Sequence, residues 1–123
     1  MADIDDKIAA LAFTAPSKRS HGRLVELIGD AAQIARSNGP KVSLSDEESG
    51  RIHGIVKNFA GVTLAEFSVT LAPAPDGIVE VSLSIDDYLR TRSTVLVLIP
   101  VSPWGAPGYK TIRSFSEYLR EKL

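Results

Sequence analysis

The chain has 123 residues, 44% of them hydrophobic and 24% charged, which is enough to bury a core as one domain without disulfides or metals. Its 14 basic and 15 acidic side chains leave a net charge of −1, which argues against nucleic acid as a partner. The absence of cysteine excludes disulfides, thiolate metal sites and cysteine nucleophiles, and it fits a cytoplasmic location. No apolar run approaches the roughly 20 residues of a membrane-spanning helix, so we expect no contact with membranes.

Residues 1–15 are predicted to form a short amphipathic arm or helix at the start of a single domain that spans residues 1–123. Ile4, Ile8 and Leu11 recur at helical spacing, and acidic residues in the first turn suit the positive end of a helix. Pro16 is expected to end this segment. The same acidic start is unlike the basic start of a signal peptide.

A long helix follows, with either Ser17 or Ser20 as its N-cap. Its apolar residues form one stripe over three turns: Leu24, Leu27, Ile28, Ala31, Ile34 and Ala35. Asn38-Gly39-Pro40 is a strong stop signal. Two strands are then predicted, at 42–44 and 51–58. The phase of the second strand is ambiguous, because apolar residues occur on both of its alternating faces.

The next two strands alternate cleanly between apolar and polar residues, over 65–71 and 79–85. The turn residues Pro73-Ala-Pro-Asp-Gly77 join them as a hairpin. We expect a register in which Leu71 pairs with Val79 and Phe67 pairs with Leu83. The opposite face of this hairpin is polar and is expected to meet water.

The C-terminal third begins with Asp86-Asp87, a pair of acids that predicts either a β-bulge or a small acidic site. Residues 95–99 are all large and apolar, so a strand over 95–101 should be covered on both faces. The final helix is predicted from its buried stripe, which consists of Tyr109, Ile112, Phe115 and Leu119.

These elements predict an α+β fold: an antiparallel meander of about five strands, with an N-terminal and a C-terminal helix packed on one face. The order α-β-β-β-β-β-α resembles a helix-grip or TATA-binding-protein-like layout in element order alone. The predicted core consists of Leu24, Ile28, Phe67, Val69, Val81, Leu83, Val97, Ile112, Phe115 and Leu119.

Four residues are candidates for ligand binding. Tyr88, Arg90 and Arg92 fall on one face of a regular strand, where a ring beside two guanidinium groups suits a small anionic ligand. The alternative is that the arginines pair with Glu66, Glu80 or Asp86. A bulge at Asp86-Asp87 would also change the face on which they lie. Trp104, in a loop rich in proline and glycine, can anchor a ligand or close one end of the core.

The residues available for catalysis are few. No nucleophile, nucleotide-binding or metal motif occurs, and His21 and His53 have no metal-ligand spacing. We therefore predict no catalytic residues, no metal and no cofactor, and expect chelators to leave stability unchanged.

Three functions remain open from the sequence. The first is a non-catalytic binding or assembly module, most simply a homodimer through the apolar strand at 95–99 or the arm at 3–12. The second is a carrier that holds a small apolar or amphipathic ligand between the sheet and the helices. The third is a small enzyme using Asp86, Asp87, Arg90 or His53.

Overall fold

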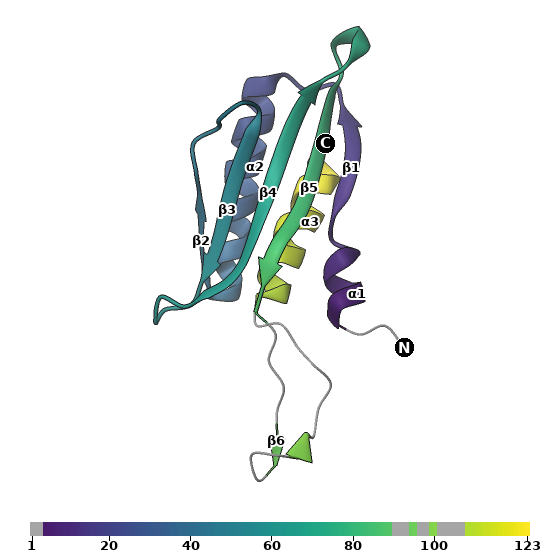
Figure 1. Cartoon of the computed structure of the whole chain (residues 1–123). Helices are drawn as coiled ribbons and strands as arrows, with labels where there is room; N and C mark the ends of the chain where they lie inside the picture. The colour runs from purple at the N-terminus through teal and green to yellow at the C-terminus, as the bar shows by residue number, and fades with distance from the viewer. Residues whose placement is uncertain (1–3, 90–93, 96–98, 101–107) are drawn as a thin grey trace.

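The computed structural model describes residues 4–89, 94–95, 99–100 and 108–123 (Figure 1). The helices are α1 (Ile4–Ala9), α2 (His21–Ala35) and α3 (Tyr109–Lys122), with short 3-10 turns at Arg36–Asn38 and Pro75–Gly77. The strands are β1 (Phe13–Ser17), β2 (Lys41–Leu44), β3 (Arg51–Lys57), β4 (Thr63–Pro73), β5 (Val79–Tyr88), β6 (Thr94–Val95) and β7 (Ile99–Pro100).

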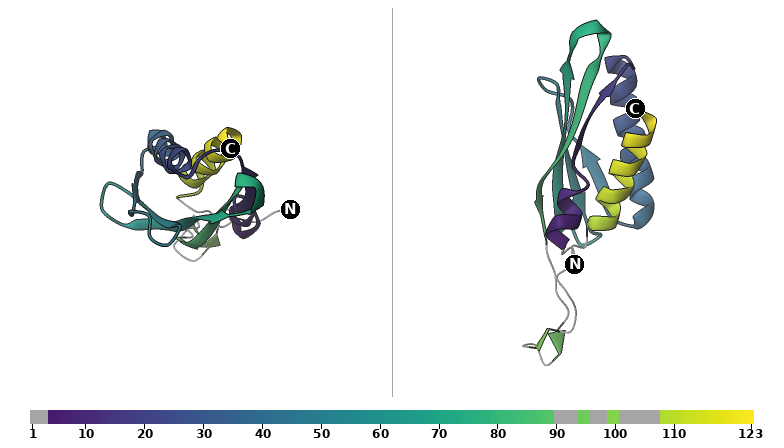
Figure 2. Two further views of the ribbon diagram at one scale, coloured as in Figure 1. Left: turned by 90° about the horizontal axis from the view of Figure 1, so that it is seen from above. Right: turned by 90° about the vertical axis from the view of Figure 1, so that its right-hand side faces the viewer.

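The main sheet has five antiparallel strands in the order β1-β5-β4-β3-β2. Helices α2 and α3 pack together on one face of this sheet, and no other helix or strand among the described residues covers the opposite face (Figure 2). The predicted α+β class, with an antiparallel sheet backed on one side by an N-terminal and a C-terminal helix, is confirmed. Among the described helices, none combines the length and the apolar composition needed to cross a membrane.

The identity of the fifth strand differs from the prediction. The segment Phe13–Ser17, predicted to belong to the arm, forms β1 and pairs with β5 at the edge of the sheet. Proline is acceptable there, because an edge strand has one side on which no N–H donor is required. The predicted strand at 95–101 is not part of this sheet. Instead Val95 pairs with Ile99 in a separate two-stranded sheet, so the expectation of one continuous strand was wrong.

The first long helix begins and ends where its sequence signals predict. Of the two candidate caps, Ser20 is the N-cap, and its hydroxyl accepts a hydrogen bond from the Arg23 N–H at 3.2 Å. After the helix, Gly39 has a φ of 112°, a conformation that favours glycine. The Arg36 guanidinium donates to the carbonyl oxygen of Val42 at 2.7 and 2.9 Å, which ties the helix end to β2.

The central hairpin has the predicted faces but a different register. Leu71 pairs with Val81 and Phe67 with Ile85, each shifted by two residues from the expected partner. The shift arises because β4 continues to Pro73, and the turn is closed by the Ala74 N–H donating to the Ile78 carbonyl at 2.8 Å. A shift of two residues preserves the side-chain alternation, so the apolar residues still face the helices.

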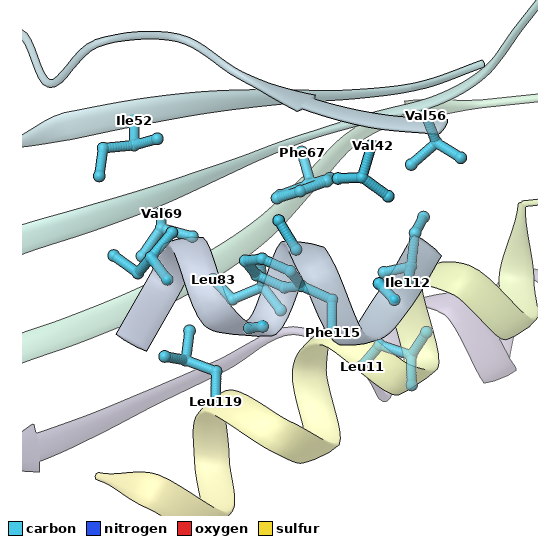
Figure 3. Close-up of a cluster of buried hydrophobic side chains, with 14 of the residues drawn as sticks. Leu11, Val42, Ile52, Val56, Phe67, Val69, Leu83, Ile112, Phe115 and Leu119 are labelled. Carbon is cyan, nitrogen blue, oxygen red and sulfur yellow. The ribbon is translucent and has the colours of Figure 1, made fainter. Parts of the chain in front are cut away.

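The core lies between the sheet and the helices. Every predicted core residue that the structure describes is buried, and Val97 lies outside the described residues. The rings of Phe67 and Phe115 pack at its centre, 4.6 Å apart (Figure 3). Ile8 and Leu11 are also buried in this core, and the Ser116 hydroxyl donates to the Leu11 carbonyl at 2.7 Å. The arm is therefore packed against its own chain.

Strand β3 shows why its phase was ambiguous in the sequence. Ile52, Gly54 and Val56 face the core, and the intervening residues face outward. A Cβ atom at Gly54 would overlap the ring of Phe67, its register partner on β4. The phenyl ring thus occupies the space of the side chain that glycine lacks, and the apolar pattern of β3 is interrupted at this position.

Candidate functional site

The surface of the sheet opposite the helices (Figure 2) is called the open face here. It carries a cluster of polar side chains from β3, β4 and β5. The register places these side chains on it: Thr14, Lys41, Ser43, Arg51, His53, Ile55, Lys57, Glu66, Ser68, Thr70, Ala72, Glu80, Ser82, Ser84, Asp86 and Asp87. Most are polar because alternate residues of each strand meet solvent there.

A β-bulge brings Asp86 into this cluster. Phe67 pairs with Ile85 and Glu66 pairs with Asp87, which leaves Asp86 as the extra residue of β5. A bulge redirects the side chains around it. The carboxylate of Asp86 is thereby directed at Ser68 on the neighbouring strand. Of the two predicted meanings of Asp86-Asp87, the bulge is confirmed.

Ser68 lies at the centre of the cluster and is only 1% exposed. Its hydroxyl donates to the Asp86 carboxylate at 2.5 Å and accepts from the Arg51 guanidinium at 2.9 Å. The same Arg51 nitrogen is 3.8 Å from the Asp86 carboxylate. Arg51, Ser68 and Asp86 thus link three neighbouring strands in one hydrogen-bonded network, which fixes the position of each charged group.

His53 borders this network on β3. Its Nε2 atom lies 3.2 Å from the Glu66 carboxylate, and its Nδ1 atom lies 3.5 Å from the Ser68 hydroxyl and 3.7 Å from the Asp86 carboxylate. The backbone N–H of His53 donates to the Ser45 hydroxyl at 2.9 Å. The imidazole is therefore held between two carboxylates on a half-exposed surface.

Two open hollows lie on either side of the network along the strands. One, of about 330 Å³, is lined by Ser45, Asp46, Glu48, Ser49, Arg51 and His53. The other, of about 290 Å³, is lined by Thr63, Leu64, Glu66, Asp87, Tyr88 and Leu89. The first hollow is lined by Arg51 of the network and by the neighbouring His53, so a group bound there would contact the network. The second is lined by Glu66 and Asp87, which lie next to His53 and Asp86 rather than in the network itself.

The geometry is poorly suited to nucleophilic catalysis. A serine nucleophile needs a base at its proton and an oxygen that a substrate can approach. Asp86 accepts from the Ser68 hydroxyl and so meets the first requirement, but the hydroxyl oxygen is buried and already accepts from Arg51, so the second is not met. The network instead presents fixed charges and hydroxyl groups, which suits recognition of a polar surface.

The residues proposed from the sequence as a ligand site are only partly described. The bulge turns Tyr88 toward the helices, where its half-buried ring packs against the core. Arg90, Arg92 and Trp104 lie outside the described residues. Asp87 faces outward opposite Glu66, and His21 is on α2 with its Nε2 atom 2.5 Å from the Glu47 carboxylate. The structure therefore separates Tyr88 from the open face.

Sequence reasoning did not identify Arg51 and Ser68 as members of a site, and it mentioned Glu66 only as a partner for Arg90 or Arg92. The signal that could have found them is the alternation of Arg51 and His53, which share one face of β3. That signal becomes readable only when the phase of β3 is known, and Gly54 hides this phase.

Comparison of the chain with models of known families, with curated proteins and with solved structures found no match. Within the described part of the chain, no group of three or more histidine and acidic side chains is arranged to hold a metal ion.

Proposed function

We propose that this chain is a non-catalytic binding and assembly module whose working surface is the open face of the sheet. The observation that carries the proposal is the asymmetry of the sheet. Both long helices cover one face, while the other holds the preformed network of Arg51, Ser68 and Asp86, with His53 beside it. Fixed side chains lose little conformational freedom when a partner binds, so such a surface is suited to recognition.

Packing favours this function over that of a carrier. The space between the sheet and the helices is filled by large buried side chains, with Phe67, Phe115 and Ile112 all at most 1% exposed (Figure 3). A carrier of an apolar ligand needs room in that layer. The hollow lined by Arg51 and His53 lies instead on the open face.

An enzyme is the second candidate, because the structure brings His53 within reach of both Glu66 and Asp86. General acid–base catalysis uses such groups when they line a site that excludes water. Here they lie on an open sheet surface, and the buried hydroxyl oxygen of Ser68 already accepts from Arg51. We therefore rank binding first. We also propose a cytoplasmic location, because the chain lacks cysteine.

The test is site-specific photo-crosslinking of the full chain in the organism that encodes it. A photoreactive phenylalanine analogue replaces Thr70, an exposed residue at the centre of the open face, or Gln33, an exposed residue of α2. We expect a discrete crosslinked product from Thr70 and none from Gln33. Equal labelling from both positions, or no product from Thr70, would contradict the proposal.

A further inference from the structure

We infer that the occupant of the open face is a second copy of this chain, related by a two-fold axis that runs parallel to β4. This inference rests on the proposed function and names its partner. It draws on the charges of the face, on their positions in the register and on the area that the face offers.

The open face is divided by charge. Its cations lie on β2 and β3, and its acids lie on β4 and β5. The cations are Lys41, Arg51 and Lys57, and the acids are Glu66, Glu80, Asp86 and Asp87. A surface with one half of each sign is complementary to itself when it is rotated so that the halves exchange places.

Two like-charge pairs on this face are unfavourable in the isolated chain. Lys41 is the direct register partner of Lys57, and Glu66 is the direct register partner of Asp87. Like charges directly opposite each other in a sheet are destabilising. Among the described residues neither lysine takes part in an ion pair, so their repulsion is not relieved within that part of the chain. A partner that presents carboxylates to the lysines would relieve it.

Symmetry selects the direction of the axis. A two-fold axis parallel to the strands places β3 against β5 of the partner, cation against acid, because the strand order is β5-β4-β3. It also places β4 against β4, so Glu66 lies near the partner's Glu66, with the His53 imidazole of its own chain 3.2 Å away. Asp87 is level with Ile55, two residues from Lys57, so each copy brings acids within reach of the other copy's lysine. An axis perpendicular to the strands would instead place β3 against β3, cation against cation.

The area of the face is sufficient for a modest dimer. Five strands about 4.8 Å apart, with about seven residues each at about 3.4 Å per residue, give on the order of 600 Å² per copy. The total of about 1,200 Å² is at the lower limit of stable interfaces, and it predicts association in the micromolar range. Face-to-face sheets also align their strands to within about 30°, as this axis requires.

Sedimentation velocity of the full chain tests the inference. We expect a monomer–dimer equilibrium at micromolar concentration whose dissociation constant rises at least about tenfold between about 0.02 M and about 0.5 M salt, because exposed charge pairs are screened. Lys57→Glu and Asp87→Lys should each raise the dissociation constant by about tenfold at low salt. The effect is this large because a two-fold axis places each substitution at two positions in the interface.

The double variant Lys57→Glu/Asp87→Lys is the decisive one. It restores opposite charges across the interface, so we expect dimerisation to return to within about threefold of the original chain. Within one chain these residues are on β3 and β5, about 10 Å apart across β4, so direct rescue inside the monomer should be weak. Lys110→Glu, on the exposed side of α3, makes the same charge change and should leave the equilibrium unchanged.

The outcomes separate this inference from the proposed function. A chain that stays monomeric at about 200 μM and low salt, where surface charges act most strongly, overturns the second copy as occupant. In that case, a photo-crosslinked product at Thr70 of a mass other than twice that of the chain still supports the binding module. Equal weakening by Lys57→Glu and Lys110→Glu, or no rescue in the double variant, also overturns the inferred geometry.

Discussion

The two faces of the sheet are built from alternate residues of the same strands, yet they differ in almost every physical property. On the helix-covered face, Val69, Val81 and Leu83 are at most 2% exposed and belong to the buried hydrophobic cluster. On the open face, Ser68 and Asp86 are held by hydrogen bonds and charge. One face stabilises the fold by excluding water, and the other leaves ordered polar groups available to a partner.

The fold therefore depends less on the identity of most outward residues than on that of the inward ones. Removing apolar atoms from the covered face should cost stability by an amount that follows their burial. Removing polar atoms from the open face should cost little, except where the polar group is itself buried. The four substitutions below test this contrast in decreasing order of effect.

Leu83→Ala should have the largest effect. Leu83 is 2% exposed and pairs with Val69 on one side and Phe13 on the other, so the substitution leaves a cavity beneath the helices. We expect a loss of about 2–5 kcal/mol in the free energy of unfolding, measured by urea denaturation. A loss below about 0.5 kcal/mol would mean that this residue does not face the core.

The sequence predicted the covered face well, because burial imposes a regular pattern on it. Clean alternation fixed the inner residues of β4 and β5, and helical stripes fixed those of α2 and α3. The edge strand β1 was missed because five residues ending in Pro16-Ser17 have too little pattern to distinguish a strand from a loop. The apolar run at 95–99 was misassigned because hydrophobicity alone does not reveal which sheet a segment joins.

Gly54→Ala should come next, because the covered face has no room at this position. An added methyl group would overlap the ring of Phe67, so the ring or the strand must move. We expect a loss of about 1–3 kcal/mol from this overpacking. Adding Phe67→Leu should reduce that cost, since the two changes share one space.

A matched control for Gly54 is Gly29→Ala in helix α2. There a Cβ atom would meet no atom within 4 Å, so the same change should stabilise the protein, by about 0.5–1 kcal/mol. If both glycine substitutions proved neutral, close packing of Phe67 against β3 would be ruled out.

The candidate site was less predictable than the core, and the reason is physical. A hydrogen-bonded network depends on which residues stand opposite each other, and the register differed by two positions from the predicted one. In addition, the bulge at Asp86 sets both the direction of that carboxylate and the inward position of Tyr88. Alternation in the sequence cannot locate a bulge to a single residue. The proposed ligand site was placed on one face by assuming regular alternation through Asp86-Asp87, and the bulge breaks that alternation.

Ser68→Ala should have an intermediate effect, because it removes a buried polar group from the open side of the sheet. The hydroxyl bridges Arg51 and Asp86, and both of these partners can still reach water. We expect a loss of about 1–2 kcal/mol in urea denaturation, because two hydrogen bonds to charged groups are lost while both partners remain hydrated. The matched change Ser84→Ala removes an exposed hydroxyl 3.5 Å from the same carboxylate and should cost less. An effect of Ser84→Ala equal to that of Ser68→Ala would show that burial of the hydroxyl is not what matters.

Ser82→Ala should have the smallest effect on the isolated chain. Ser82 is next to the buried Val81 on the same strand but faces outward, where its hydroxyl lies 3.1 Å from that of Thr14 in an exposed contact. Loss of such a contact should change the free energy of unfolding by less than about 0.5 kcal/mol at low protein concentration.

The measurement also bears on the dimer, because a face covered by a second copy is no longer exposed. If the effect of Ser82→Ala grows as the protein concentration is raised through the range of association, the open face is covered in the assembled form, since the stability of an oligomer depends on concentration. If the effect of Ser82→Ala on the free energy of unfolding stays small while the protein dimerises, the second copy binds elsewhere. The open face would then be a solvent-exposed surface in the dimer as well, and the two faces would differ only in that one is buried and the other is not.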